Sequence, residues 1–160
     1  MKKYSCCFTG HRQIAPAQKK YIAKRLEEVV INLISKGYRY FATGGAVGFD
    51  TLASECILSL KKQYPHIKLI LVLPCPSQPN FWNSSDISTY EKIKIQADKV
   101  VYIAQQYSRT CIFQRNRHLV DHSSVCIAYQ LKPNGGTAYT VDYAHKQNLQ
   151  VINIASVASH

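Results

Sequence analysis

The fold is decided by residues 38–50, which read Tyr-Arg-Tyr-Phe-Ala-Thr-Gly-Gly-Ala-Val-Gly-Phe-Asp. Residues 38–43 predict a strand, a glycine loop follows at residues 44–48, and a helical pattern begins at Phe49. Such a loop lets the backbone approach a ligand closely, and the helix then points its unpaired N–H groups at that ligand. A second loop of this kind, Asn134-Gly135-Gly136-Thr137, also stands between a predicted strand and a predicted helix. Together the two loops predict a phosphate-bearing ligand held between them.

Strands and helices alternate along the whole chain. The expected strands are residues 3–8, 38–43, 67–73, 99–103, 124–129 and 150–154. The first two expected helices are residues 16–36, which Gly37 ends, and residues 49–63. A third helix carries a capping box, Ser88-x-x-Glu91, at its start, and residues 104–113 are expected to be irregular. The last two helices are residues 114–121 and a helix that runs from the second glycine loop to residue 147. This alternation predicts an α/β fold, a Rossmann-like three-layer arrangement around a mostly parallel central sheet. We expect residues 1–160 to form a single domain.

The composition is that of a globular protein, with 46% hydrophobic and 18% charged residues, which argues against disorder. No apolar run approaches the roughly 20 residues that a membrane span requires. The N-terminal stretch turns polar at Thr9 before an apolar region of signal-peptide length can form, so we expect a cytoplasmic protein. The six cysteines form no C-x-x-C pair and fit a reduced compartment. His118 and His122 share a helical face but lack an evident third ligand, so no metal is expected.

The formal net charge of +11 favours anionic partners such as nucleotides, nucleic acid or an acidic protein. A lysine-rich solvated surface is the alternative, because many of the lysines fall on the exteriors of predicted helices. The sequence contains no basic tail and no run of alternating aromatic and basic residues of the kind that single-strand binders use.

Thr9-Gly10-His11-Arg12 follows the first predicted strand, at the edge of the sheet where ligands of such folds bind. Arg12 can hold a phosphate through two donors, although an ordinary surface turn is the alternative. Two roles stay open for Asp50. Its carboxylate either satisfies the helix dipole, or it serves the ligand by binding a ribose hydroxyl or positioning a water. The chain has neither a G-x-G-x-x-G fingerprint nor a Walker lysine motif.

Further candidates are Arg115-Asn116-Arg117, in which Arg115 faces the phosphates or the surface, and Thr137, whose hydroxyl stands at a helix start. Phe81 and Trp82 either stack on a base or cover the core.

These motifs, taken in order, resemble the SLOG superfamily, in the branch of small YpsA-type proteins of uncharacterised function. The resemblance covers essentially the whole chain. The matching segments are residues 7–12, 43–53, 73–76, which include Pro74, 115–121 and 135–141. It implies a Rossmann-like domain whose glycine loops bind nucleotides or nucleotide-derived ligands. Relatives in this superfamily are the lonely-guy phosphoribohydrolases, the single-strand-binding DNA-processing protein A and sensor domains for NAD-derived signals, so the fold alone does not choose a function.

The phosphoribohydrolases carry a P-G-G-x-G-T-x-x-E motif whose glutamate helps to cleave the N-glycosidic bond. Thr140 stands where that glutamate would fall, whereas Arg115 matches the arginine of those enzymes. A missing acid or base removes a catalytic contribution of roughly 10²–10⁴-fold. The resemblance therefore leans away from an enzyme, with Asp50, Arg115 and Asp121 as the catalytic candidates if turnover occurs.

The preferred hypothesis is binding of a nucleotide or an ADP-ribose-like signal, as a sensor or a sequestering protein, with no further cofactor required. The alternatives are a nucleoside-monophosphate phosphoribohydrolase-like enzyme and single-stranded nucleic-acid binding through the basic surface. A homodimer is a reasonable expectation, because many relatives self-associate. The expected ligand-binding residues are Thr9, Gly10, His11, Arg12, Gly44, Gly45, Gly48, Asp50, Pro74, Arg115, Asn116, Gly135, Gly136 and Thr137.

Overall fold

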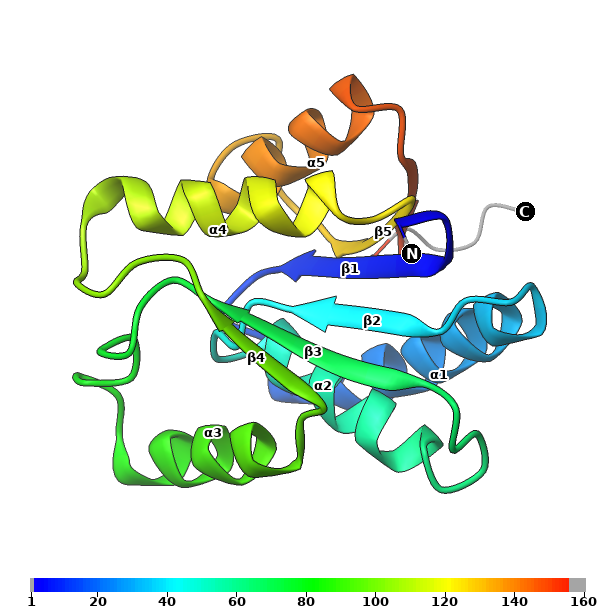
Figure 1. Cartoon of the computed structure of the whole chain (residues 1–160), viewed down its shortest axis with the longest axis horizontal. Coiled ribbons are helices and arrows are strands. Elements are labelled where there is room, and N and C mark those ends of the chain that lie inside the picture. Colours follow the sequence, from blue (N-terminus) through cyan, green and yellow to red (C-terminus); the bar gives the residue numbers. More distant parts are fainter. Residues whose placement is uncertain (1, 156–160) are drawn as a thin grey trace.

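A computed structural model describes residues 2–155, in which a six-stranded sheet lies between two layers of helices (Figure 1). The strands are β1 (Ser5–Gly10), β2 (Tyr40–Thr43), β3 (Lys68–Leu73), β4 (Lys99–Tyr102), β5 (Val125–Tyr129) and β6 (Gln150–Asn153). The helices are α1 (Lys19–Ser35), α2 (Phe49–Leu60), α3 (Ser84–Gln96), α4 (Arg109–Asp121) and α5 (Gly136–Lys146), with short 3₁₀ turns at Lys2–Tyr4 and Pro16–Gln18.

All the strand pairs of the sheet are parallel, in the order β4-β3-β2-β1-β5-β6. The expectation of a three-layer α/β fold is therefore confirmed, and the sheet is parallel throughout rather than mostly so. The chain moves outward from β1 to β4, crosses back, and continues from β5 to β6 on the other side. The switch in strand order thus lies between β1 and β5, where the loops that follow these two strands diverge.

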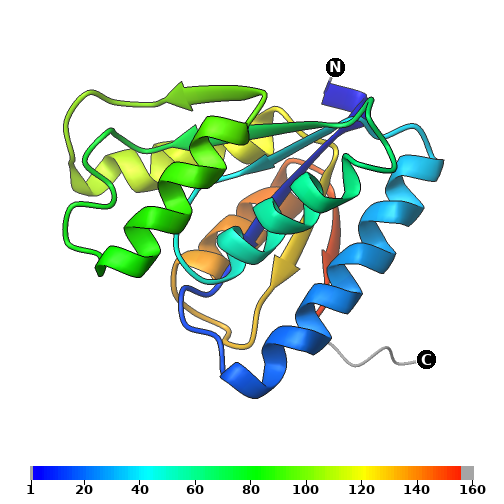
Figure 2. The same cartoon turned by 90° about the horizontal axis from the view of Figure 1, so that it is seen from below.

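The helices α1, α2 and α3 cover one face of the sheet, whereas α4 and α5 cover the other (Figures 1 and 2). The core on the first face is built around β1 to β3 and includes Phe8, Phe41, Phe49, Leu26 and Leu71, each 0–1% exposed. A smaller core on the second face joins β1, β3 and β5 to α4 and α5. The expectation that residues 67–73 form a strand buried on both faces is fully met on one face only, because Leu69, Leu71 and Leu73 are buried whereas Lys68 and Ile70 on the other face are half-buried.

Helix α1 begins at Lys19 rather than at residue 16, after the 3₁₀ turn Pro16–Gln18, and two further helix starts differ from the sequence expectation. Helix α3 begins at Ser84, before the Ser88 capping box that the sequence suggested, because the Asn83 side chain caps it by accepting a hydrogen bond from the Asp86 N–H (2.8 Å). Helix α4 begins at Arg109, capped by Ser108, so most of the stretch expected to be irregular is either helix or cap. Polar residues that serve as caps made both segments look like loops in the sequence.

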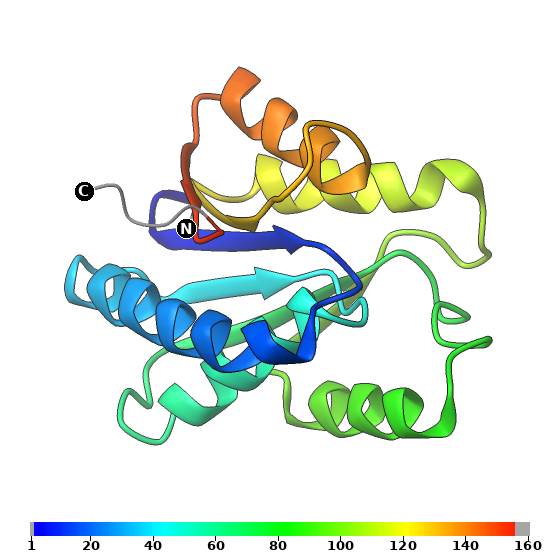
Figure 3. The same cartoon turned by 180° about the vertical axis from the view of Figure 1, so that it is seen from behind.

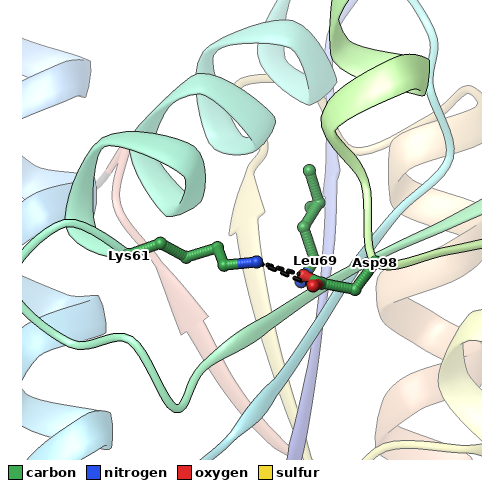
Figure 4. Close-up of polar contacts among 3 residues, drawn as sticks. All are labelled: Lys61, Leu69 and Asp98. Atoms are coloured by element: carbon green, nitrogen blue, oxygen red, sulfur yellow. Dashed lines mark hydrogen bonds and ion pairs between the residues drawn. The ribbon is translucent and has the colours of Figure 1, made fainter.

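A polar clamp ties α2, β3 and β4 together at the amino ends of the strands (Figure 4). Lys61 Nζ lies 2.7 Å from both carboxylate oxygens of Asp98, and the Leu69 N–H donates to Asp98 Oδ2 at 2.8 Å. Partial burial alone would raise the pKa of Asp98, but the hydrogen bonds from Lys61 and Leu69 outweigh it and hold that pKa below its usual range. The clamp lies at the sheet edge opposite to the glycine loops.

Candidate functional site

A cleft of about 320 Å³ opens at the carboxyl ends of β1 and β5, at the switch in strand order. In Figure 3 the arrowheads of β1 (blue) and β2 (cyan) point to the right, and the loops that follow the strands lie on that side. Four segments supply the walls: the loop after β1, the first glycine loop with the start of α2, one face of α4 and the loop that leads into α5. The lining residues are Phe8, Thr9, Gly10, His11, Arg12, Ala46, Asp50, Ile112, Arg115, Asn116, Leu119, Lys132, Asn134, Gly135, Gly136 and Thr137.

The loops after β1 and β5 are joined by His11. Its Nε2 accepts a hydrogen bond from the Leu131 N–H (2.9 Å), and its ring packs edge-on against Tyr129. Partial burial, followed by the charge of Lys132, lowers the pKa of His11. The imidazole is therefore kept neutral with Nε2 as an acceptor, which fixes the position of the second loop over the cleft.

The glycines of the first loop pack against protein, whereas Ala46 of the same loop lines the cleft. The Phe49 N–H donates to the His11 carbonyl (3.0 Å), and Gly10 lies against the Phe49 ring. Gly48 has φ +82°, and a Cβ atom there would collide with the backbone of Arg12. The glycine at this position is required so that the two loops can meet, and this contact places Arg12 at the cleft.

Arg115 is buried, at 4% exposure, and reaches from α4 across to the first glycine loop. Its Nη1 donates to the Gly44 carbonyl, and its Nε donates to Asn116 Oδ1 (2.8 Å). Burial lowers the pKa of Arg115, and the nearby Asp50 carboxylate acts against this shift. The guanidinium thus has a structural partner in the protein and also forms part of the cleft wall.

Asp50, which is 7% exposed, supplies the acidic side chain of the cleft lining. Its Oδ2 accepts a hydrogen bond from the Ala46 N–H at 3.2 Å. Burial raises the pKa of Asp50, whereas the charges of Arg115 and Arg12 and the Ala46 N–H act against this increase. A buried carboxyl beside two arginines can position a polar ligand group or take part in proton transfer.

The second glycine loop faces open space. Gly135 is the N-cap of α5 with φ +97°, and no atom would lie within 4 Å of a Cβ added to Gly135 or Gly136. The cap has no side chain, and the first helical turn contains no acidic residue. The N–H groups of this turn, together with the positive end of the helix dipole, are therefore available to an anion in the cleft.

The structure brings together most of the expected site residues. Those that line the cleft are Thr9, Gly10, His11, Arg12, Asp50, Arg115, Asn116, Gly135, Gly136 and Thr137. Gly44, Gly45 and Gly48 lie behind the cleft wall, where they contact Arg115, Leu73 and Arg12, respectively. Pro74 lines a smaller adjoining cavity.

Asp121 lies away from the cleft. It is exposed near the end of α4 and accepts a hydrogen bond from the Tyr143 hydroxyl at 2.7 Å. Thr140 does not line the cleft either, and its hydroxyl donates to the Gly136 carbonyl (3.0 Å) within α5. Of the three catalytic candidates, the structure places Asp50 and Arg115 together and Asp121 apart.

Sequence reasoning missed Lys132, and it named Asn134 as part of the second glycine loop but not as a ligand-binding residue; both lie within three residues of Gly135 and line the cleft. It also missed Ile112 and Leu119, which share one face of α4 with Arg115 and Asn116. The spacing i, i+3, i+4, i+7 of these four residues is the signal that could have found them, had the helix been started at Arg109.

His118 and His122 stack with ring centroids 4.1 Å apart, and within residues 2–155 no three potential ligands gather into a metal site. Phe81 is fully exposed, whereas Trp82 packs edge-on against Tyr90. The six cysteines are free. None of the helices that the structure describes has the length and apolar character needed to cross a bilayer.

The fold defines the chain as a Rossmann-like α/β protein, with a cleft at the carboxyl ends of its strands. A model of the YspA SLOG family (YpsA) matches residues 6–157, and the chain belongs to this family. The SPbeta prophage-derived protein YoqJ of Bacillus subtilis, which is named as uncharacterized, is 30% identical over 138 residues, covering 78% of this chain and 81% of that protein. The UPF0398 protein YpsA of Bacillus subtilis is 25% identical over 133 residues, covering 81% of this chain and 74% of that protein.

A similar solved structure is that of the single-stranded-DNA-binding DNA processing protein A of Helicobacter pylori. It superimposes with a TM-score of 0.66 at 20% identity. The match covers 92% of this chain and 63% of that protein, so it supports the Rossmann-like fold alone.

Proposed function

We propose that the protein binds a nucleotide or a nucleotide-derived small molecule, of the ADP-ribose type, in this cleft and acts as a sensor or a sequestering protein. The observation that carries the proposal is the open N-terminus of α5, with Gly135 and Gly136 facing empty space opposite Arg12 and Arg115. Backbone N–H groups and a helix dipole at such a position favour a phosphate. The arginines supply the charge-assisted hydrogen bonds that phosphate recognition uses.

The charges around the cleft fit an anionic ligand. Arg12 and Lys132 are exposed at its rim, Arg115 is buried in its wall, and Asp50 supplies one negative charge against them. The polar groups surround a floor that includes the apolar side chains of Ile112 and Leu119. The volume of the cleft lies at the lower end of the range of small-molecule sites, and its polar side chains suit a charged ligand.

Two measurements test the proposal. Mass spectrometry of the small molecules released on heat denaturation should identify a co-purifying nucleotide. Calorimetric titration with AMP, ADP and ADP-ribose should then give measurable affinity for at least one of them. Absence of both a released nucleotide and any affinity would refute the proposal.

Gly136→Val tests the location of the site. The added side chain would enter empty space, so the protein should fold normally while the phosphate position is blocked. Lys132→Ala should weaken binding by roughly tenfold, the loss of one charge-assisted contact. Lys24→Ala, which removes an exposed lysine from α1, is the matched control and should leave affinity unchanged. Normal affinity of both cleft variants would place the ligand elsewhere.

Single-stranded nucleic acid is the second candidate, because the structure assembles an aromatic and basic cluster that the sequence alone did not reveal. Arg117 of α4 lies over the rings of Tyr139 and Tyr143 of α5, and Phe113 packs edge-on against Tyr139. Base stacking on such rings is tolerant of sequence. The test is binding of a labelled oligonucleotide, which should weaken with salt and on Tyr139→Ala. No binding at about 50 mM salt would exclude this candidate, since electrostatic attraction is strong there.

A phosphoribohydrolase-like activity rests on Asp50 and Arg115 alone, because Thr140 occupies the position of the glutamate in the motif. Release of free base from AMP by the native protein, lost in Asp50→Asn, would support turnover. Stable binding of AMP without release of base would assign the cleft to binding.

A further inference from the structure

A second, smaller cavity adjoins the cleft on the far side of Arg12. It has a volume of about 100 Å³ and is lined by Arg12, Pro74, Gln78, Trp82, Tyr107 and Ile112. Arg12 and Ile112 line both cavities, so the two are neighbours that share one wall. The smaller cavity is built by the loops that follow β3 and β4, whereas the cleft lies between β1 and β5.

The chemistry of the two cavities differs. The cleft presents helix N–H groups and cationic side chains. The smaller cavity is lined by two aromatic rings, Trp82 and Tyr107, with Pro74 and Ile112 as further apolar contacts and with Gln78 and the shared Arg12 as its polar side chains. Such a lining suits a flat, aromatic ring, because planar rings gain both apolar burial and favourable ring contacts against aromatic side chains.

The aromatic lining combines one fixed ring and one accessible ring. Trp82 packs edge-on against the buried Tyr90, with ring centroids 5.2 Å apart, which holds the indole in place. Tyr107 is 64% exposed, so a ring placed beside it would cover apolar surface that now faces water. An enclosed cavity of roughly 150 Å³ takes up a benzene ring. At about 100 Å³ the smaller cavity encloses only part of a ring, and the remainder of the ring would lie against the exposed Tyr107.

We infer that the ligand carries a nucleobase, or an equivalent planar ring, that occupies this second cavity while its phosphate lies at the N-terminus of α5. Arg12, between the two cavities, faces the sugar-phosphate portion. This inference rests on the proposed function and deepens it. Trp82 and Tyr107 become specificity-determining residues, and base-bearing nucleotides are preferred over sugar phosphates that have the same charged end.

The experiment compares AMP with ribose 5-phosphate, which has the phosphate and the sugar but no base. Calorimetry measures both probes against the native protein, Tyr107→Ala, Trp82→Leu and Phe81→Ala. Phe81 is the matched control, because it is a fully exposed aromatic residue next to Trp82 that does not line the cavity. Tyr107→Ala should fold normally, since that side chain is largely exposed.

AMP affinity should fall roughly 5- to 100-fold in Tyr107→Ala and Trp82→Leu, the range expected for loss of one stacked ring. Ribose 5-phosphate should bind the native protein more weakly and be unaffected by either substitution, and Phe81→Ala should alter neither probe. Trp82 is the sole tryptophan of the chain, so its fluorescence offers an independent readout. AMP should change that fluorescence at saturation, whereas ribose 5-phosphate should not.

The two possible failures are distinguishable. If AMP binds and depends on Lys132 but is unaffected by Tyr107→Ala and Trp82→Leu, the phosphate site stands and the base cavity is refuted. An equal loss of affinity for both probes would also refute it, because the aromatic residues would then act only through the fold. If neither probe nor ADP-ribose binds the native protein, the proposed function itself fails.

Discussion

His11 shows how one side chain connects sequence-distant parts of the site. It follows β1, yet its Nε2 accepts the N–H of Leu131, 120 residues further along the chain. The bond requires a neutral imidazole, and burial together with Lys132 lowers the pKa of His11 accordingly. Protonation would place a hydrogen on the accepting nitrogen and a charge beside Lys132, so the contact between the two loops depends on pH.

This dependence has a definite sign. The unfolded chain takes up the His11 proton near pH 6.5, whereas the folded protein takes it up only at a lower pH. His11 therefore destabilises the fold increasingly as the pH falls below about 6.5. Urea unfolding of the native protein and of His11→Gln at pH 7 and pH 5 should show a smaller loss of stability on acidification in the variant. His118, whose pKa is also lowered, is present in both proteins and cancels. An identical pH dependence in the two proteins would contradict this role.

At the scale of elements, the two glycine loops do different work although their sequences look alike. In the loop before α2, a Cβ atom added to any of the glycines would collide with other protein atoms. In the loop before α5, a Cβ atom added to Gly135 or Gly136 would meet open space. The first loop therefore holds Arg12 and Arg115 in place, and the second is the part that a ligand can approach. Their difference comes from what the chain places opposite each loop.

Substitution of one glycine in each loop should separate these roles. Gly48→Ala should lower the free energy of unfolding by about 1–3 kcal/mol, because alanine is strained at positive φ and its Cβ would collide with Arg12. Gly136→Ala should change that free energy by less than about 0.5 kcal/mol, since its Cβ meets open space. Thermal or urea unfolding of the pair measures both. Equal destabilisation would mean that the second loop is packed as tightly as the first.

The Lys61–Asp98 clamp gives a second prediction at this scale. Asp98→Asn should cost about 1–2 kcal/mol at pH 7, because it weakens hydrogen bonds that join α2, β3 and β4. The pKa of Asp98 is held low in the folded state, so its stabilisation is present above about pH 4 and is lost as the pH falls through the folded value. The difference between the two proteins in urea unfolding should therefore shrink at low pH.

Glu91→Gln is the control for this clamp, since it removes the same charge from a surface pair with Lys94 in which the Glu91 side chain is 48% exposed. It should change stability by less than about 0.5 kcal/mol. A loss at pH 7 as large as that of Asp98→Asn would assign the effect to net charge rather than to the clamp.

The fold as a whole buries the cysteine thiols away from solvent. Five of the six cysteines are buried, and Cys56 is partly buried, with desolvation as the main cause that raises its pKa to about 12. Because the thiolate is the reactive form, burial and a high pKa both suppress reaction. With a thiol reagent at pH 8, the native protein should react slowly at all positions, and six thiols should react at once in urea. A thiol that reacts on mixing with the native protein, and is absent in Cys56→Ser, would show that Cys56 is accessible.

The local pattern of the sequence was enough to predict the alternation of elements and the class of fold. Two kinds of pattern carried this prediction: the apolar runs at residues 67–73 and 124–129, and the glycines after the second and fifth strands. Both kinds involve residues only a few positions apart, so the sequence displays them directly. The helix starts were less predictable, because Asn83 and Ser108 are polar residues that serve equally as loops or caps until the helix is formed. Element order also indicated one edge of the sheet as the place of the site.

Only the tertiary structure decided which residues at that edge share a space. Strand order places β5 beside β1, so the loops after these strands bring Gly136 and Arg12 to the same cleft. Asp121 lies outside the cleft, although it belongs to the same helix as Arg115. It also placed Trp82 and Tyr107 in one cavity and left Phe81 in solvent. Local propensity acts through neighbours in the chain, whereas a cleft depends on the packing of segments far apart in it. For this reason the sequence by itself determined the fold class and the family, and the packing of the loops determined the shape and charge of the site.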